Sequence, residues 1–84
     1  MKTNQEIRLM IERLEEEKET LPEFSFFGDN NWQIYDTAIK ALTERWDKSE
    51  FNKQIIQNDQ EESFAFSAVQ WLEGELEDEE FLNG

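Results

Sequence analysis

Two stretches of the chain repeat apolar residues at the spacing of an amphipathic helix. In the first, near residues 4–20, the repeating positions are Ile7, Met10, Ile11 and Leu14. In the second, near residues 31–47, they are Tyr35, Ala38, Ile39, Leu42 and Trp46. Spacings of three and four residues place each set on one helical face. Because Pro22 ends the first stretch, we expect two helices that pair antiparallel through these faces.

The C-terminal half has less regular apolar patterns. A short helix over residues 50–57, capped by Ser49, would turn Phe51 and Ile55 inward. Residues 64–76 fit a broad helical stripe. Their alternating members, which would also suit a strand, are Phe64, Phe66 and Ala68. With the hairpin, these segments predict an all-α fold: a small helical bundle built on an antiparallel helical hairpin, with C-terminal helical segments and an acidic tail.

The connection between the two long helices is rich in aromatic residues. It holds Phe24, Phe26 and Phe27 just before Gly28. Each Phe side chain contributes roughly 1.5–3 kcal/mol when it is buried, which a solvated loop would forgo. We therefore expect these rings to cover the open end of the hairpin. The alternative is an exposed aromatic patch that binds a partner.

Charge is distributed unevenly along the 84 residues, whose net charge is −13. Residues 1–53 hold all 8 Lys and Arg together with 12 Asp and Glu, whereas residues 54–84 hold 9 acids and no base. We expect one small domain over residues 1–74 and a flexible acidic tail over residues 75–84. The candidate partner-binding residues are Glu73, Glu75, Glu77, Asp78, Glu79, Glu80, Phe81 and Leu82.

This acidic character limits the classes of partner. A strongly negative protein is repelled by nucleic acid and by anionic membranes, so we expect the partner to be a basic protein. The chain has no Cys and no His, which removes thiolate metal sites and the commonest general base. The sequence thus predicts a non-enzymatic interaction protein with no cofactor, and one version of this hypothesis is a nucleic-acid mimic or inhibitor. Deletion of residues 75–84 should then weaken binding without unfolding the domain.

No apolar run reaches the roughly 20 residues of a transmembrane helix, so we expect a soluble cytoplasmic protein. Three tryptophans, Trp32, Trp46 and Trp71, are many for a chain of 84 residues. They suit a core, but a domain this small buries only about 60–65% of its unfolded surface. A homodimer, or a structural oligomer with no ligand, is therefore a further hypothesis.

The N-terminal half combines a Glu-rich first helix with Leu21-Pro22-Glu23 and Phe27-Gly28-Asp29-Asn30, and then a helix with Ile and Leu spacing and an acidic end. Over about residues 5–47, this arrangement resembles a loosely defined group of small acidic proteins from bacterial plasmids and mobile elements, whose function is unknown. The resemblance implies a bacterial intracellular setting, in which a nucleic-acid mimic would serve a mobile element. It supplies no functional residues.

Two groups of carboxylates suggest an alternative, enzymatic function. An E-E-x-x-E motif consists of Glu15, Glu16 and Glu19, and an E-x-x-D motif consists of Glu44 and Asp47. Together they resemble the signature of MazG-type all-α nucleotide pyrophosphohydrolases, and the resemblance implies magnesium-dependent hydrolysis. Such patterns arise easily by chance when 21 of 84 residues are acidic. An antiparallel hairpin would also hold the two motifs at opposite ends, so we favour the non-enzymatic hypothesis.

Overall fold

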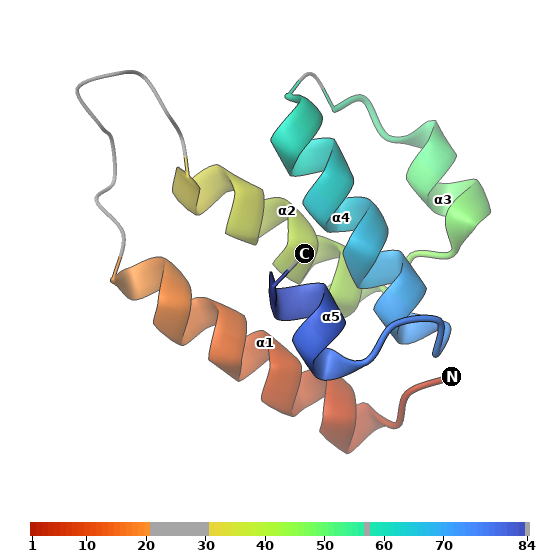
Figure 1. The fold of residues 1–84 in the computed structure, drawn as a ribbon. Helices are drawn as coiled ribbons and strands as arrows, with labels where there is room; N and C mark the ends of the chain where they lie inside the picture. Colours follow the sequence, from red (N-terminus) through yellow and green to blue (C-terminus); the bar gives the residue numbers. More distant parts are fainter. Residues whose placement is uncertain (21–30, 57, 84) are drawn as a thin grey trace.

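Helices account for all the regular secondary structure in the described part of the chain. The computed structural model describes residues 1–20, 31–56 and 58–83. Its helices, drawn in Figure 1, are α1 (Asn4–Glu19), α2 (Asn31–Glu44), α3 (Lys48–Lys53), α4 (Asp59–Leu72) and α5 (Asp78–Asn83). The predicted all-α fold class is confirmed, and residues 64–72 form a helix rather than a strand. The prediction for the aromatic connector falls on Phe24, Phe26, Phe27 and Gly28, which lie outside the described residues.

α1 and α2 form the antiparallel helical hairpin that the sequence predicts. At one end, the ammonium group of Lys18 in the last turn of α1 pairs with the Asp36 carboxylate near the start of α2. At the other end, the Arg45 guanidinium just beyond α2 donates a hydrogen bond to the side chain of Asn4. The start of each helix therefore lies beside the end of the other.

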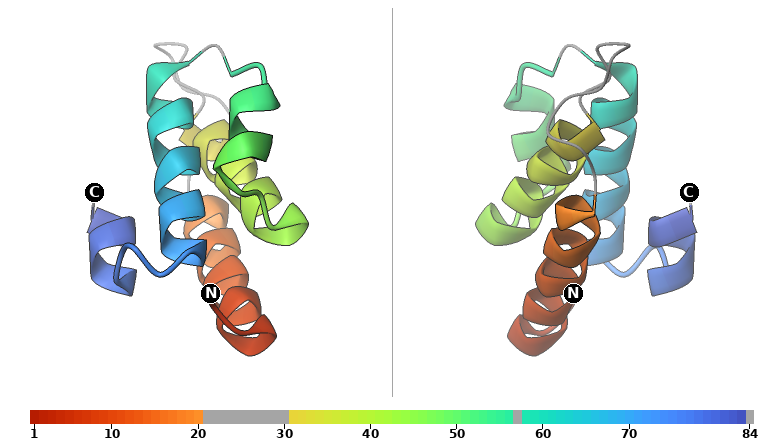
Figure 2. Two further views of the ribbon diagram at one scale, coloured as in Figure 1. Left: turned by 90° about the vertical axis from the view of Figure 1, so that its right-hand side faces the viewer. Right: turned by 90° about the vertical axis from the view of Figure 1, so that its left-hand side faces the viewer.

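α4 joins most of the remaining elements to this hairpin. α2 packs against both α1 and α4, and α3 and α5 each pack against α4. The side views place α3 and α5 on opposite sides of α4 (Figure 2). The N-terminal segment is also attached to α4, because the Lys2 backbone N–H donates to the Leu72 carbonyl at 3.1 Å. The acidic C-terminal helix and the N-terminus thus approach the same end of α4.

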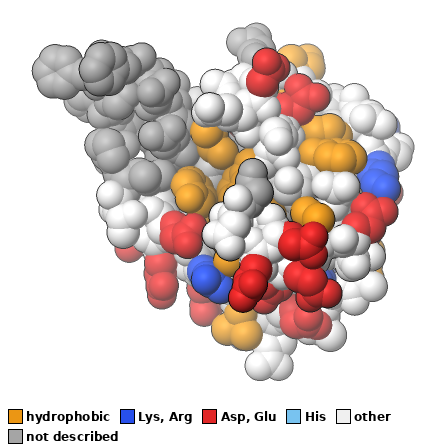
Figure 3. Space-filling view, in the orientation of Figure 1, with side chains coloured by type: hydrophobic (Ala, Val, Ile, Leu, Met, Phe, Trp, Pro, Cys, Tyr) orange, Lys and Arg blue, Asp and Glu red, His pale blue; other side chains and the backbone are white. Residues whose placement is uncertain are grey.

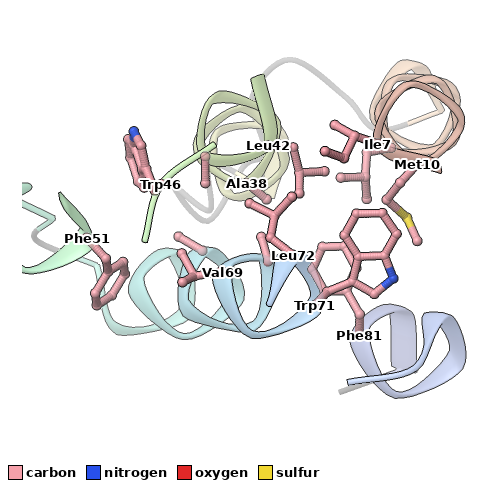
Figure 4. Close-up of a cluster of buried hydrophobic side chains, with 14 residues drawn as sticks. Ile7, Met10, Ala38, Leu42, Trp46, Phe51, Val69, Trp71, Leu72 and Phe81 are labelled. Atoms are coloured by element: carbon pink, nitrogen blue, oxygen red, sulfur yellow. The ribbon is translucent and has the colours of Figure 1, made fainter. Parts of the chain in front are cut away.

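The core consists of one continuous apolar cluster drawn from all five helices and the α2–α3 connection. Its buried members are Ile7, Met10, Leu14, Ala38, Ala41, Leu42, Trp46, Phe51, Ala65, Ala68, Val69, Trp71, Leu72 and Phe81, and no polar or charged residue of the described chain is buried with them. Trp46 lies on the side of Phe51, away from Ile7 and Met10 (Figure 4). The expectation that Trp46 faces the first helix is therefore wrong.

α2 ends three residues earlier than predicted, and this explains the position of Trp46. Arg45 adopts a left-handed conformation (φ 56°), and the Trp46 N–H then bonds back to the Ala41 carbonyl at 3.0 Å. Asp47, which was expected to continue the helix, instead caps α3 by accepting from the Glu50 N–H at 2.7 Å. A side chain that can cap a new helix competes with continuation of the old one.

α3 is consequently shorter and begins earlier than predicted. It covers Lys48–Lys53 rather than residues 50–57, and Asp47 replaces Ser49 as its cap. Phe51 is buried as expected, but Ile55 lies beyond the helix and is 92% exposed. The inward orientation predicted for Ile55 is therefore wrong, because it depended on a helix that continued through it.

A Schellman motif ends α4 and turns the chain towards α5. Gly74 has a φ of +84°, a backbone conformation that residues other than Gly rarely adopt. The Glu75 N–H bonds to the Gln70 carbonyl at 2.8 Å and the Gly74 N–H bonds to the Trp71 carbonyl at 3.0 Å. Gly74 is thus the stop signal of α4 and lies outside its interior.

The acidic C-terminal segment forms a helix on the core, which differs from the flexible tail expected over residues 75–84. The Phe81 ring is fully buried and stacks on Phe64, with 5.0 Å between ring centroids, and on Trp71, at 6.1 Å. A buried aromatic side chain contributes roughly 1.5–3 kcal/mol. Phe81 therefore attaches this segment to the core, although the residues around it are mostly acidic.

Candidate acidic interaction surface

The carboxylates predicted to bind a partner lie at the end of α4, in the turn after it and on α5. Asp and Glu side chains gather over α5 in the space-filling view (Figure 3). The exposed members are Glu75, Glu77, Asp78, Glu79 and Glu80, whereas Glu73 is half-buried. The two apolar candidates differ from expectation. Phe81 is fully buried, and half-buried Leu82 packs against the core. Phe81 is therefore unavailable as a contact for a partner.

Two hydrogen bonds fix the start of α5 and hence the direction of its carboxylates. The Trp71 indole N–H donates to the Asp78 carboxylate at 2.7 Å. The Glu77 backbone N–H donates to the Glu80 carboxylate at 3.2 Å, in the manner of an N-terminal cap. Acidic residues in a first helical turn also interact favourably with the helix dipole. The acid-rich sequence is thus compatible with this helix because its charges gather at the N-terminal end.

Basic residues neutralise only one side of this surface. The Lys48 ammonium lies 2.9 Å from the Glu75 carboxylate and 3.5 Å from that of Glu73. The pKa of Lys48 is raised, first by its hydrogen bond with Glu75 and second by the negative charge of Glu75. No cation of residues 1–20, 31–56 or 58–83 pairs with Glu77, Glu79 or Glu80. These three carboxylates are the part of the predicted site that is most available to a basic partner.

A small hollow opens beside this surface, where α1, α4 and α5 meet. Its volume is about 150 Å³, and it is lined by Glu6, Leu9, Met10, Arg13, Trp71 and Asp78. The Leu9 side chain is 55% exposed, so the wall of the hollow includes apolar surface that the core leaves uncovered. No pattern along the chain indicates this hollow, because its walls come from distant segments: Glu6 and Asp78 are 72 residues apart.

The two carboxylates of the hollow are held by hydrogen bonds from their own neighbourhoods. The Thr3 backbone N–H donates to the Glu6 carboxylate at 3.2 Å, and the Thr3 hydroxyl accepts from the Glu6 N–H, which completes a capping box. The contact with Thr3 holds the pKa of Glu6 below its ordinary value, while the negative charge of Asp78 acts in the opposite direction. Glu6 and Asp78 thus contribute two carboxylates to the lining of one hollow.

A cation already lies over the indole ring that borders the hollow. The Lys2 ammonium lies 5.0 Å from the centroid of the Trp71 ring, within the range of a cation–π interaction. It also lies 4.0 Å from the Glu6 carboxylate. The environment of Trp71 therefore favours positive charge, both through the ring and through the carboxylates beside it.

The structure does not bring together the two acidic motifs of the enzymatic hypothesis. Glu15, Glu16 and Glu19 lie in the second half of α1. Glu44 is the last residue of α2 and Asp47 follows it, at the end that adjoins Asn4. Glu16 is twelve residues from Asn4, or about 18 Å along a helix. Within the described ranges, no group of three or more acidic side chains is arranged to hold a metal ion.

The second motif also has local structural roles. The Glu44 carboxylate accepts a hydrogen bond from the Trp46 indole N–H at 3.1 Å, and the Asp47 carboxylate caps α3. Both carboxylates therefore have hydrogen-bond partners within the protein.

Comparisons with protein-family models, with curated proteins and with solved structures found no significant match to this chain. Among the described helices, none is long and apolar enough to cross a membrane.

Proposed function

We propose that the protein is a non-enzymatic acidic interaction protein that binds a basic protein surface. The observation that carries this proposal is a set of three carboxylates, Glu79 and Glu80 on α5 and Glu77 just before it, which form no ion pair with any cation of the described residues. All three are exposed, and Phe81 attaches this segment to the core. Because the helix is fixed, its carboxylates lose less conformational freedom on binding than they would in a flexible tail.

The chemistry of the partner follows from the charge. A net charge of −13 repels phosphate groups and attracts surfaces rich in Lys and Arg. A nucleic-acid mimic is the special case in which that basic surface otherwise binds DNA or RNA. The pyrophosphohydrolase hypothesis is less well supported, because its two acidic motifs lie at opposite ends of the α1–α2 hairpin.

Phe81 changes how the proposal must be tested. Deletion of residues 75–84 would remove a buried aromatic side chain, so it would destabilise the domain as well as remove charge. Substitution of the carboxylates is the cleaner test. Glu77→Gln, Glu79→Gln and Glu80→Gln together remove three negative charges and leave Phe81 in place. Glu12→Gln, Glu15→Gln and Glu16→Gln form a control with the same change of charge on the exposed face of α1.

The probe is a short fluorescein-labelled peptide in which lysine and alanine alternate, and its affinity is measured by fluorescence anisotropy. We expect wild-type binding to weaken steeply between about 50 and about 300 mM salt, because the attraction is screened. The triple variant of α5 should bind about tenfold more weakly, and the triple variant of α1 about twofold. The proposal fails if the wild-type protein does not bind at the lowest salt concentration, or if both triple variants bind equally.

A further inference from the structure

The hollow between α1, α4 and α5 combines features that suit the side chain of a lysine or arginine. Long cationic side chains bury their methylene groups against apolar surface while the charged group stays near water or an acid. Leu9 and Met10 provide apolar wall on α1, and Glu6 and Asp78 provide carboxylates. The volume of about 150 Å³ is far above the roughly 10–15 Å³ that a single water molecule needs.

The charges that face the hollow also favour a cation. Glu6 and Asp78 line the same hollow, so a positive charge that enters it meets two carboxylates. Arg13 lines the same hollow and brings the net charge of its lining residues to −1, and the Lys2 ammonium lies 4.0 Å from the Glu6 carboxylate. Lys2 is not part of the lining, but its position over Trp71 shows that a cation is stable beside this ring.

We propose that this hollow is the point at which the basic partner inserts one lysine or arginine side chain. The methylene groups of that side chain contact Leu9, and its charged group lies between Glu6 and Asp78. This inference rests on the proposed function, since it names where the basic partner is anchored. The carboxylates of α5 attract the partner over a longer range, and the hollow determines its register on the surface.

A matched pair of substitutions tests the apolar contact. Leu9 and Ile55 are both exposed aliphatic residues, at 55% and 92%, but only Leu9 borders the hollow. Neither side chain belongs to the core, so Leu9→Gln and Ile55→Gln should both leave the fold intact. With the lysine–alanine peptide, we expect Leu9→Gln to weaken binding about threefold and Ile55→Gln to leave it unchanged.

A second pair tests the two carboxylates. Glu6→Gln retains the capping box, and Asp78→Asn keeps an oxygen that can accept from the Trp71 indole N–H. The pair therefore changes charge with little change of structure. The control is Glu16→Gln with Glu62→Gln, two exposed acids that do not line the hollow. We expect about a tenfold loss of affinity for the first pair and about twofold for the control.

Nuclear magnetic resonance locates the contact independently. Peptide binding should shift the indole N–H resonance of Trp71, which donates to Asp78. The indole N–H resonance of Trp46, which donates to Glu44, should stay unchanged. The inference is overturned if Leu9→Gln has no greater effect than Ile55→Gln, or if the Trp71 resonance does not move. If the triple variant of α5 still weakens binding in that case, the proposed function stands without the hollow. If the wild-type protein does not bind the peptide, both are wrong.

Discussion

α1 and α5 are both acid-rich helices, but they are attached to the same core in different ways. α1 has 16 residues, buries Ile7, Met10 and Leu14 along one face and begins with a capping box. α5 has 6 residues and buries only Phe81. A helix can therefore be held by several apolar side chains in sequence or by one large aromatic ring. Only the first arrangement leaves a periodic pattern in the sequence.

The partners of Phe81 explain how one residue can be enough. Its ring lies between Phe64 and Trp71, which α4 contributes, and Phe64 also meets Tyr35 of α2 edge-on with 5.4 Å between centroids. Aromatic pairs in such arrangements contribute about 0.5–1.5 kcal/mol beyond the burial of their area. α5 thus completes an aromatic cluster that the other helices begin.

The largest effect in this comparison is expected for Phe81→Ala. Loss of a buried Phe typically costs about 3–5 kcal/mol, because the contacts are lost and a cavity remains. We expect the free energy of unfolding, measured by urea denaturation, to fall by about this amount. Leu82→Ala, next to it and only half-buried, should cost less than half as much. Equal effects of the two variants would show that α5 is not anchored by Phe81.

Leu14→Ala should have the next largest effect. Leu14 is fully buried in α1, and such substitutions cost about 2–5 kcal/mol. The comparison predicts that α1 stays attached in this variant, because Ile7 and Met10 remain, whereas α5 should separate from the core in Phe81→Ala. Amide hydrogen exchange of each helix distinguishes the two outcomes. Selective loss of protection across α1 in Leu14→Ala would contradict the idea of shared anchoring.

This difference between repeated and single anchors also decides what could be predicted from the sequence. The faces of α1 and α2 are visible because Ile7, Leu14 and Leu42 recur at helical spacing, and all three are buried. The attachment of α5 is not visible, because Phe81 lies among acids and its partners are distant in sequence.

Local competition between caps explains the errors around α3. The capping ability of Asp47 and the left-handed conformation of Arg45 end α2 early, and no apolar spacing records either. The carboxylates of the candidate surface were predictable, because the Asp and Glu residues are visible in the sequence itself. The hollow was not, because it exists only where α1 meets α4 and α5.

A smaller effect is expected at the start of α1. Thr3→Ala removes the hydroxyl that accepts from the Glu6 N–H at 3.1 Å. Loss of an N-cap side chain typically costs about 0.5–2 kcal/mol. Thr3→Ser keeps the hydroxyl and should retain most of the stability, as measured by thermal unfolding. If both variants are equally destabilised, the Thr3 methyl group rather than the cap is responsible.

The smallest effect concerns pH and the Glu6 carboxylate. The hydrogen bonds with Thr3 lower the pKa of Glu6 from its ordinary value of 4.5. A lowered folded-state pKa adds stability above the unfolded-state value, and that stability is lost as pH falls through the folded-state value. The advantage of the wild-type protein over Glu6→Gln should therefore be present at neutral pH and shrink below about pH 4.5. A difference in unfolding free energy that is constant with pH would contradict this role of Glu6.

The attachment of α5 underlies both the fold and the proposed interaction surface, and the amide of Phe81 reports on it most directly. This N–H donates to the Glu77 carbonyl at 3.0 Å, and its side chain is fully buried. Native-state hydrogen exchange at this amide separates a docked helix from a frayed end. We predict exchange at least about a hundredfold slower than in an unfolded peptide. Exchange at the unfolded rate, while the amides of Met10 and Leu14 stay protected, would contradict the account.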